Sequence, residues 1–251
     1  MDEKDSFKLS RTGIELYVRC PRCFYLEKKL GVKQPPGYPF SLNSAVDHLL
    51  KKEFDFHRTE KTSHPLMKQY GVDAVPFVHD NMNMWRENFK GISFLHPKTN
   101  FHVFGAVDDI WQNKSGELLV VDYKSTSKDS EITLDADWQN SYKRQMEVYQ
   151  WLLRRNDFKV SDTGYFVYCN GKKDREAFDG KLEFDVKIIP YKGDDKWVEP
   201  TILQIKKLLE EDKIPRFTNT CDFCTYQQKL KDVGKEREQT RRIKINLEKV
   251  K

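Results

Sequence analysis

The fold is decided by two apolar stretches, Phe101-His102-Val103-Phe104-Gly105-Ala106-Val107-Asp108-Asp109-Ile110-Trp111 and Glu117-Leu118-Leu119-Val120-Val121-Asp122-Tyr123-Lys124. Both are rich in β-branched, leucine and aromatic residues, which is typical of strands. The residues between them, Gln112-Asn113-Lys114-Ser115-Gly116, have the composition of a hairpin turn. We therefore predict two antiparallel strands that are adjacent in one sheet.

Each predicted strand ends its apolar run at an acidic residue, Asp108 in the first and Asp122 in the second. We expect the two carboxylates to meet at one edge of the sheet, with Lys124 on the same strand face as Asp122. Carboxylate oxygens suit Mg²⁺ or Mn²⁺, and water bound to such an ion can attack a phosphodiester. A nearby ammonium group can orient or deprotonate that water and offset charge on the phosphate.

The acidic-x-Lys pattern is weak evidence on its own, because it occurs eight times in this chain. Context separates the copies. Only the copy at Asp122 ends a Val/Leu-rich strand that follows a partner strand across a turn, whereas Asp185-Val186-Lys187 lacks such a partner.

The remaining hydrophobic patterns predict helices around further strands. The clearest helix covers 137–155, where Trp138, Tyr142, Gln145, Tyr149 and Leu152 share one face. The other expected elements are a helix from Ser10 that is broken at Pro21 and resumes to Gly31, a helix capped by Asn43 that carries His48, a helix over 84–89, strands over 163–169 and 182–188, and a helix from about Pro200. We predict an α/β fold, with a central mixed β-sheet flanked by helices, in one domain over 1–251.

Paired cysteines stand at both ends of the chain, as Cys20-Pro21-Arg22-Cys23 and Cys221-Asp222-Phe223-Cys224. Two such pairs supply the four thiolates of a tetrahedral metal site or an iron-sulfur cluster. The competing interpretation is two unrelated knuckles or ordinary core residues. Cys169 lies alone in an apolar run, where an inert buried thiol is expected.

Four motifs in this order resemble those of the RecB-like branch of the PD-(D/E)XK nucleases, which includes the nuclease domains of RecB and AddB and the CRISPR-associated RecB-like exonucleases. The motifs are His48 in its helix, Gly105-x-x-Asp108, Asp122-Tyr123-Lys124 and Gln145-x-x-x-Tyr149. Tyr17-x-x-Cys20-Pro21 and the late cysteines extend the resemblance over nearly the whole chain.

The resemblance implies an α/β fold with a restriction-endonuclease-like core, and a role for each motif. Asp108 and Asp122 would bind the catalytic Mg²⁺ or Mn²⁺, with His48 and the backbone carbonyl of Tyr123. Lys124 would be the catalytic lysine. Gln145 and Tyr149 would support the active site and contact DNA.

The cysteines depart from the family pattern, because iron-sulfur members commonly place one cysteine early and three late. Here Cys23 would have to replace the missing late ligand, and the symmetric pairs suit Zn²⁺ equally well. In either case a structural [4Fe-4S] cluster or Zn²⁺ would clasp residues 1–31 to 215–228, around catalytic motifs in 43–155.

Charge and hydropathy narrow the function further. Of the 44 Lys and Arg and 39 Asp and Glu residues, nine basic and four acidic ones lie in 225–251, so the whole net charge of +5 lies there. The basic tail, 229–251, either contacts a phosphate backbone or forms a solvated helix. No apolar run approaches the ~20 residues of a membrane span, and the acidic, polar start lacks the pattern of an export signal. We expect a cytoplasmic protein.

The leading hypothesis is a metal-dependent nuclease, with DNA ends or single-stranded DNA as substrate, in DNA repair, recombination or defence. The alternatives are a catalytically silent nucleic-acid-binding protein that uses the cysteine clasp and tail, and a scaffold in a larger complex. The sequence leaves open exo- or endonuclease action, polarity, DNA or RNA preference, oligomeric state and any helicase or CRISPR partner.

Overall fold

The computed structural model describes residues 6–37 and 41–249, with side chains as far as Arg241. The chain forms two compact units, of which the first contains residues 1–15 and 37–203 and the second contains 16–36 and 204–251. The organisation of 1–251 as a single domain stays a prediction. Within 6–37 and 41–249, no helix combines the length and apolarity needed to cross a lipid bilayer.

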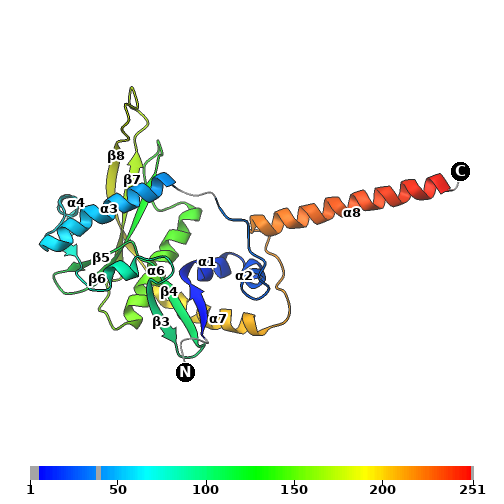
Figure 1. Ribbon diagram of the computed structural model, residues 1–251, viewed down its shortest axis with the longest axis horizontal. Coiled ribbons are helices and arrows are strands. Elements are labelled where there is room, and N and C mark those ends of the chain that lie inside the picture. Colours follow the sequence, from blue (N-terminus) through cyan, green and yellow to red (C-terminus); the bar gives the residue numbers. More distant parts are fainter. Residues whose placement is uncertain (1–5, 38–40, 250–251) are drawn as a thin grey trace. The chain divides into compact units, whose positions relative to one another are not determined.

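The first unit contains a five-stranded mixed sheet with the order β2-β5-β6-β7-β8 (Figure 1). Strand β6 is parallel to β7, and the other neighbours are antiparallel. The strands are β2 (Ala74–Pro76), β5 (Asp109–Asn113), β6 (Leu118–Thr126), β7 (Thr163–Gly171) and β8 (Phe184–Lys192). The mixed α/β fold and the β5–β6 hairpin are therefore confirmed.

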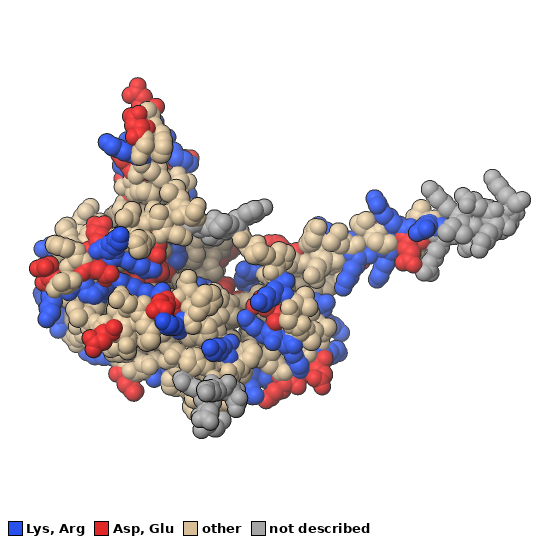
Figure 2. Space-filling view, viewed as in Figure 1, with Lys and Arg blue, Asp and Glu red and all other residues tan. Residues whose placement is uncertain are grey.

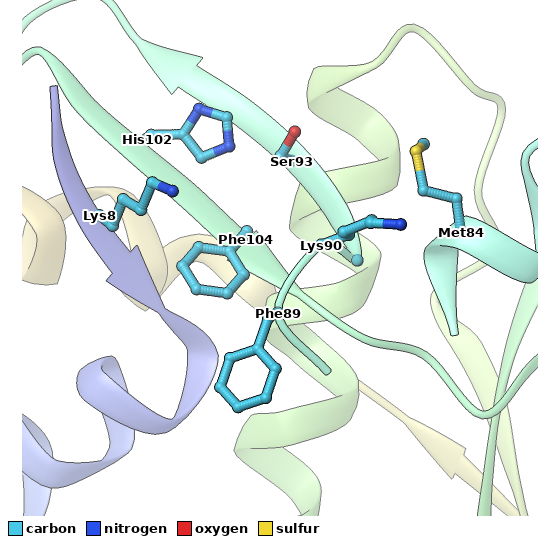
Figure 3. A pocket seen from close by; sticks show the side chains of 8 residues that line it. Lys8, Met84, Phe89, Lys90, Ser93, His102 and Phe104 are labelled. Carbon is cyan, nitrogen blue, oxygen red and sulfur yellow. The ribbon is translucent and has the colours of Figure 1, made fainter. Parts of the chain in front are cut away.

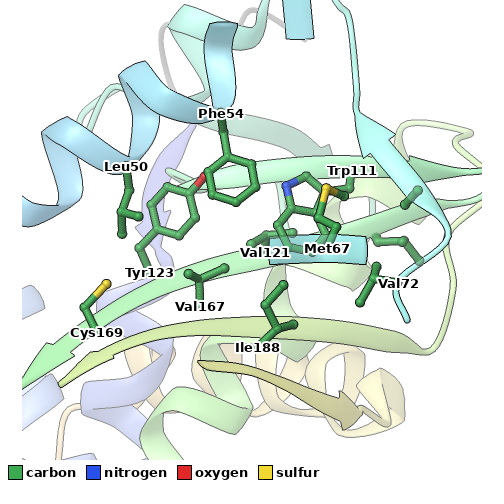
Figure 4. Close-up of a cluster of buried hydrophobic side chains, with 12 residues drawn as sticks. Leu50, Phe54, Met67, Val72, Trp111, Val121, Tyr123, Val167, Cys169 and Ile188 are labelled. Atoms are coloured by element: carbon green, nitrogen blue, oxygen red, sulfur yellow. The ribbon is translucent and has the colours of Figure 1, made fainter. Parts of the chain in front are cut away.

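Successive side chains of β6 point alternately to the two faces of the large sheet. Val121 and Tyr123 point toward α3 (Ser41–Glu60), where they join Phe54 and Trp111 in a buried cluster (Figure 4). The intervening Val120, Asp122 and Lys124 belong to the other face by the two-residue period, and that face is covered by α6 (Asn140–Arg155). The same period therefore directs Asp122 and Lys124 toward α6.

A second sheet of three strands has the order β1-β4-β3, with β1 parallel to β4 and β3 antiparallel to it. Its strands are β1 (Phe7–Ser10), β3 (Ile92–His96) and β4 (Phe101–Gly105). Strand β1 was not predicted, because a segment of only four residues shows too little periodicity to be distinguished from the loop before a helix.

The prediction of one strand over 101–111 is wrong. The chain leaves the small sheet after Gly105 and enters the large sheet at Asp109. Two close approaches cause the break. The N–H of Val107 donates to the carbonyl of Trp85, at 3.1 Å, rather than to a strand. A Cβ on Gly105 would lie 2.7 Å from the ring of Tyr149, so only glycine fits there.

The remaining predicted elements shift by a few residues. α3 begins at Ser41 rather than after Asn43, the helix predicted over 84–89 is the short α5 (Met82–Trp85), and β8 begins at Phe184. The predicted helix over 137–155 forms as η2 (Asp137–Gln139) followed by α6. The first unit also contains α4 (Pro65–Gln69) and η3 (Asp195–Trp197).

Two helices begin or end in the first unit and continue in the second, α1 (Arg11–Arg19) and α7 (Val198–Glu210). Ser10 accepts a hydrogen bond from the N–H of Gly13 at 3.0 Å, which confirms the predicted cap of α1. The second unit contains α2 (Pro21–Lys28) and the long α8 (Asp222–Lys249). The break at Pro21 is also confirmed, since α2 starts there with Cys20 as its N-cap.

Candidate active site and metal centre

Asp122 is the most constrained carboxylate of the candidate active site. Its side chain is fully buried, and its oxygens receive no hydrogen bond of good geometry from the described residues. The ammonium of Lys124 forms an ion pair with one of these oxygens. Burial raises the pKa of Asp122 to about 7, against the lowering effect of the lysine charge. The site therefore holds a negative charge that is only partly compensated.

Lys124 is also nearly buried, with 14% of its side chain exposed. Burial alone would lower its pKa, but the charges of Asp122 and Asp108 raise it above the ordinary value. Its ammonium also lies 4.5 Å from the ring centroid of Tyr142, a cation–π contact. The lysine is therefore held as a cation at this end of β6.

Asp108 lies in the bend between the two sheets, immediately before β5. The backbone N–H of Tyr123 donates to its Oδ2 at 2.9 Å, so Asp108 lies beside the segment Asp122–Lys124. Its Oδ1 is 3.6 Å from the ammonium of Lys51. The structure thus brings together the two carboxylates and the lysine that the sequence predicted, although the strands differ from those expected.

Helix α3 presents Asp47 to this group, and His48 is exposed. Lys51 connects Asp47 to Asp108, since its ammonium is 2.7 Å from Asp47 Oδ2 and 3.6 Å from Asp108 Oδ1. Burial, together with the negative charge of Asp108, raises the pKa of Asp47. Consecutive helical residues point about 100° apart, so the side chain of His48 leaves α3 in a different direction from that of Asp47. A role for His48 as a metal ligand stays a prediction.

Behind the candidate site, Asp109 forms the centre of a buried ionic network that sequence reasoning missed. Its Oδ1 accepts from the guanidinium groups of Arg58 and Arg86, the latter at 3.0 Å, and its Oδ2 accepts from the Tyr123 hydroxyl at 2.8 Å. Asp109 is fully buried. With its oxygens satisfied, this carboxylate acts as a structural anchor for both β6 and α3.

Arg86 connects this network to the candidate metal ligand. Its Nε donates to the backbone carbonyl of Asp108 at 3.0 Å, and its Nη1 donates to both oxygens of Asp55 at 2.9 and 2.8 Å. The bend at Asp108 is therefore fixed by an arginine from beyond α5. The Asp108-Asp109 pair was the only sequence signal for this arrangement, and nothing in the sequence distinguished the half-buried carboxylate of Asp108 from the fully buried one of Asp109.

Gln145 and Tyr149 lie together on α6, as predicted from their spacing. The Gln145 amide donates to the Tyr149 hydroxyl at 3.2 Å. Tyr149 is buried, which raises its pKa, and the charges of Asp108 and Asp122 act in the same direction. These two residues therefore lie within electrostatic reach of the carboxylates.

The residues present fit a divalent cation. Two carboxylates, Asp122 in the middle of β6 and Asp108 in the bend before β5, supply hard oxygen ligands. Both oxygens of Asp122 lack hydrogen bonds among the described residues. Mg²⁺ and Mn²⁺ prefer such ligands and retain waters to complete their shells. Asp108 and Asp122 would hold the ion, whose charge would compensate a group that Lys124 balances only in part.

In the second unit, all four paired cysteines form one buried cluster. Their Sγ atoms lie within 4.8 Å of one another, and three Sγ–Sγ pairs are 3.6 Å apart: Cys20–Cys224, Cys23–Cys221 and Cys23–Cys224. No other group of three or more candidate metal-binding side chains lies this close together in the described part of the chain. The competing interpretation of two unrelated knuckles is therefore wrong, and the cluster could bind a metal.

The pKa values of two of these thiols differ strongly. Burial raises the pKa of Cys23 to about 11. For Cys20 burial acts in the same direction, but hydrogen bonds from the Cys23 N–H and neighbouring groups lower the pKa to about 7. Cys20 is therefore the more readily ionised of the two thiols.

Helix α8 follows this cluster, and its described side chains are mostly exposed. Figure 2 shows Lys and Arg side chains along its surface, interspersed with acidic residues. The tail is thus helical and exposed as far as Arg241, which fits either of the two predictions, and contact with a phosphate backbone stays a prediction. Side chains of tail residues beyond Arg241 lie outside the described part.

Comparison with known proteins agrees with this site. Residues 41–228 match the model of the PD-(D/E)XK nuclease superfamily. The chain belongs to this superfamily. PD-(D/E)XK proteins are usually metal-dependent nucleases, and the matched range contains every residue of the carboxylate-lysine site described above.

Other comparisons are less informative. A search of curated proteins gives no significant match. Among solved structures, the crystal structure of SSO0001 aligns over 83% of this chain and 79% of that chain, with 16% identity and a TM-score of 0.36.

Proposed function

We propose that this PD-(D/E)XK protein is a Mg²⁺- or Mn²⁺-dependent nuclease of the RecB-like branch that hydrolyses DNA at ends or in single strands. The observation that carries the proposal is the fully buried Asp122, which has two oxygens without hydrogen bonds and lies beside Lys124 and Asp108. A purely structural carboxylate would be satisfied, as Asp109 is. A cytoplasmic location and a role in repair, recombination or defence belong to the same proposal.

Each residue has a separate task in this proposal. Asp108 and Asp122 hold the divalent ion, which supplies Lewis acidity and a more acidic water when it is bound. Lys124 is held as a cation by the carboxylates, so it donates to the attacking water or to a phosphate oxygen as charge develops there. The carbonyl of Tyr123 and the ring of His48 remain candidate ligands.

For the cysteine cluster we propose Zn²⁺ rather than an iron-sulfur cluster. Four thiolates about 2.3 Å from one tetrahedral ion are about 3.8 Å from each other, close to the 3.6 Å Sγ–Sγ distances in the second unit. A cubane cluster holds its thiolates farther apart, because iron and sulfide lie between them. Elemental analysis and the visible spectrum of anaerobically purified protein decide between the two, since thiolate-bound iron absorbs near ~400 nm.

The direct test of the nuclease proposal is cleavage of end-labelled single-stranded and duplex DNA, and of matched RNA, with Mg²⁺, Mn²⁺ or EDTA. We expect products only with a divalent ion. The pattern of products distinguishes stepwise release from an end from internal cuts. The alternative, a catalytically silent binding protein, predicts retention of DNA without products under every condition.

Replacing Lys124 by Ala should slow cleavage by ~10² or more, because a positioned proton donor or electrostatic group is lost. Divalent-ion binding should persist, since both carboxylates remain. The rate is measured under single-turnover conditions. Lys114→Ala is the matched control, because Lys114 is an exposed lysine beside the same hairpin; an equal loss in both variants would contradict a specific role for Lys124.

Tyr149→Phe and Gln145→Ala should lower the cleavage rate more than they lower the melting temperature. Their hydrogen bond is 3.2 Å long and lies near the carboxylates, so removing one partner disturbs the active-site wall while most packing remains. Rate and melting temperature are measured on the same preparation. A loss of stability with unchanged activity per folded molecule would assign both residues to the core alone.

A further inference from the structure

The open face of the small sheet carries an aromatic hollow that the proposed chemistry does not use. By the alternation of β1, β3 and β4, the side chains of Lys8, Ser93, His102 and Phe104 lie on this face. Together with the loop after α5 they line a hollow of about 240 Å³ (Figure 3). The opposite face of the sheet is covered by α6.

Phe89 is the most unusual residue of this hollow, because 93% of it is exposed. Figure 3 shows its ring beside that of Phe104, with the ammonium of Lys8 on the other side of Phe104. A single exposed apolar residue is ordinary, but an almost fully exposed phenylalanine beside a second accessible ring forms a surface for a flat apolar ligand.

The loop that carries Phe89 is held in place rather than loose. Gly91 has a φ of +66°, and a Cβ there would lie 2.4 Å from the carbonyl oxygen of Gly105. The N–H of Gly91 donates to the carbonyl of Met84 at 3.3 Å. Because only glycine permits this approach to β4, the loop is pinned against the strand, and Phe89 is presented in a defined position.

Cationic groups surround the two rings. Lys8 and Lys90 line the hollow. Lys90 is paired with Glu87 at 2.7 Å, but both side chains are more than half exposed, so the pair contributes little stability and opens readily. Arg11, at the start of α1, has a buried Nε without a hydrogen-bond partner among the described residues. In this arrangement the aromatic rings can stack on nucleic-acid bases while the neighbouring cationic groups bind the phosphates between those bases.

The hollow continues toward the candidate active site. A second, smaller hollow of about 70 Å³ is lined by Arg11, Phe104 and Tyr149, among others, and so shares Phe104 with the first. Tyr149 in turn lies within electrostatic reach of Asp108 and Asp122. Tyr149 itself is buried, so a strand whose phosphate lay at the carboxylates would pass over it and along Arg11, and could place its next bases on Phe104 and Phe89.

We propose that this face of the β1-β4-β3 sheet binds unpaired bases of single-stranded nucleic acid, with Phe104 and Phe89 as stacking surfaces and Lys8, Lys90 and Arg11 as phosphate contacts. The inference deepens the proposed nuclease function and rests on it for the position of the scissile phosphate. Separate single rings favour unpaired bases, because the bases of a duplex are already stacked on one another.

The test measures binding of a fluorescent 20-nucleotide dT strand and of a blunt 20-base-pair duplex by anisotropy, without added divalent ions so that no cleavage occurs and the cysteine site keeps its metal. Loss of one base-stacking contact should weaken single-strand binding about five-fold or more in Phe89→Ala. Phe89→Trp should retain the affinity of the parent protein for the dT strand, because it keeps an aromatic ring. Phe89→Leu keeps apolar area without a ring and should lose affinity. Phe104→Ala should act like Phe89→Ala, and its melting temperature reports any folding defect.

Matched controls separate this site from general effects. Phe178→Ala removes another exposed phenylalanine, 72% exposed and in the β7–β8 connection, and should leave affinity unchanged. Lys8→Gln should reduce the slope of log affinity against log salt by about one, whereas Lys181→Gln should not. Parent affinity for the dT strand in Phe89→Ala, or equal losses in the Phe178 control, would overturn the proposal.

Hydrolysis of a small phosphodiester, p-nitrophenyl thymidine 5′-phosphate, distinguishes failure of this inference from failure of the proposed nuclease function. This probe occupies only the carboxylate site, so Phe89→Ala should hydrolyse it at the parent rate. If the parent protein cleaves neither the small diester nor DNA but Phe89 variants still lose strand affinity, the nuclease proposal fails and the binding face stands. If cleavage is intact and no variant changes strand affinity, the binding face fails alone.

Discussion

Replacing Asp122 by Asn should abolish Mg²⁺- or Mn²⁺-dependent cleavage and also remove the thermal stabilisation that either ion gives to the parent protein. Asp122 is fully buried, and its oxygens have the ammonium of Lys124 as an ion-pair partner but no hydrogen bond of good geometry from described residues. A bound ion would supply the further contacts that these oxygens lack. Asn is nearly isosteric but neutral, and it offers only one oxygen. The substitution therefore removes the charge while it retains the volume.

The size of the stabilisation can be stated in advance. An ion that binds only the native state at 100 times its dissociation constant adds about 2.7 kcal/mol to the free energy of unfolding. For a protein of this length that corresponds to a rise of roughly 5–10 °C in melting temperature. Thermal scans of parent and variant without added divalent ion, with Mg²⁺ and with Mn²⁺ measure it without reference to catalysis.

Protonation of Asp122 gives a second signature. Burial raises its pKa to about 7, above the ordinary value for an aspartate, so the metal-free native state binds this proton more tightly than the unfolded chain does. The resulting contribution of Asp122 to the free energy of unfolding is fully present below the pKa that Asp122 has in the unfolded chain. It is lost as the pH rises through about 7. The metal-free parent should lose stability over this range, and Asp122→Asn should lack that contribution.

Asp185→Asn is the matched control, because Asp185-Val186-Lys187 repeats the acidic-x-Lys pattern on β8. Asp185 is exposed and pairs with Lys172 at 2.7 Å. Its variant should keep both cleavage and ion-dependent stabilisation. Cleavage at the parent rate by Asp122→Asn would sink the assignment of the active site.

The part of the site that depends on local periodicity was predictable from sequence. The two-residue period of β6 places Asp122 and Lys124 on one face, and the spacing of four residues places Gln145 beside Tyr149 on α6. The family resemblance selected these residues among many similar patterns. Their roles in catalysis await the experiments above.

The part that depends on nonlocal contacts was not predictable. The break after Gly105 follows from the approach of Tyr149 and from the bond between Val107 and the carbonyl of Trp85, both distant in sequence. The rotational phase of α3, which presents Asp47 rather than His48 to Asp108, is set by packing on β6. A helical pattern specifies which residues share a face, but it does not specify what that face meets.

The paired cysteines predicted their cluster more reliably than hydrophobic patterns predicted the strands. Metal binding requires particular residue types at a particular spacing, whereas core packing accepts many apolar residues. The paired cysteines also give the second large expected effect. Replacing Cys20 or Cys224 by Ser should eliminate most of the bound metal and lower the melting temperature sharply. The binding free energy of a structural Zn²⁺ site, about 10–16 kcal/mol in small zinc domains, is folding energy that the variant forfeits.

The metal would join segments that are far apart in the chain. Cys23 and Cys221 are 198 residues apart in sequence, and their Sγ atoms are 3.6 Å apart. A metal bound by both in the native state therefore stabilises the contact between these two segments. Calorimetry of the parent should show one transition if 1–251 unfolds as a single domain, and two if the unit with the cysteines unfolds by itself. Chelation should shift the transition that contains this unit.

Cys169→Ser is the matched control for the loss of a buried thiol. Cys169 lies in the cluster between α3 and the large sheet, and burial raises its pKa to about 11, as expected for an inert thiol. The variant buries a hydroxyl in apolar surroundings and should lose some stability, but its metal content should match the parent. Metal content is measured by mass spectrometry of purified protein. Parent-like metal content in Cys20→Ser or Cys224→Ser would show that the four thiols do not share an ion, because a closed tetrahedral site loses its geometry whichever ligand is removed.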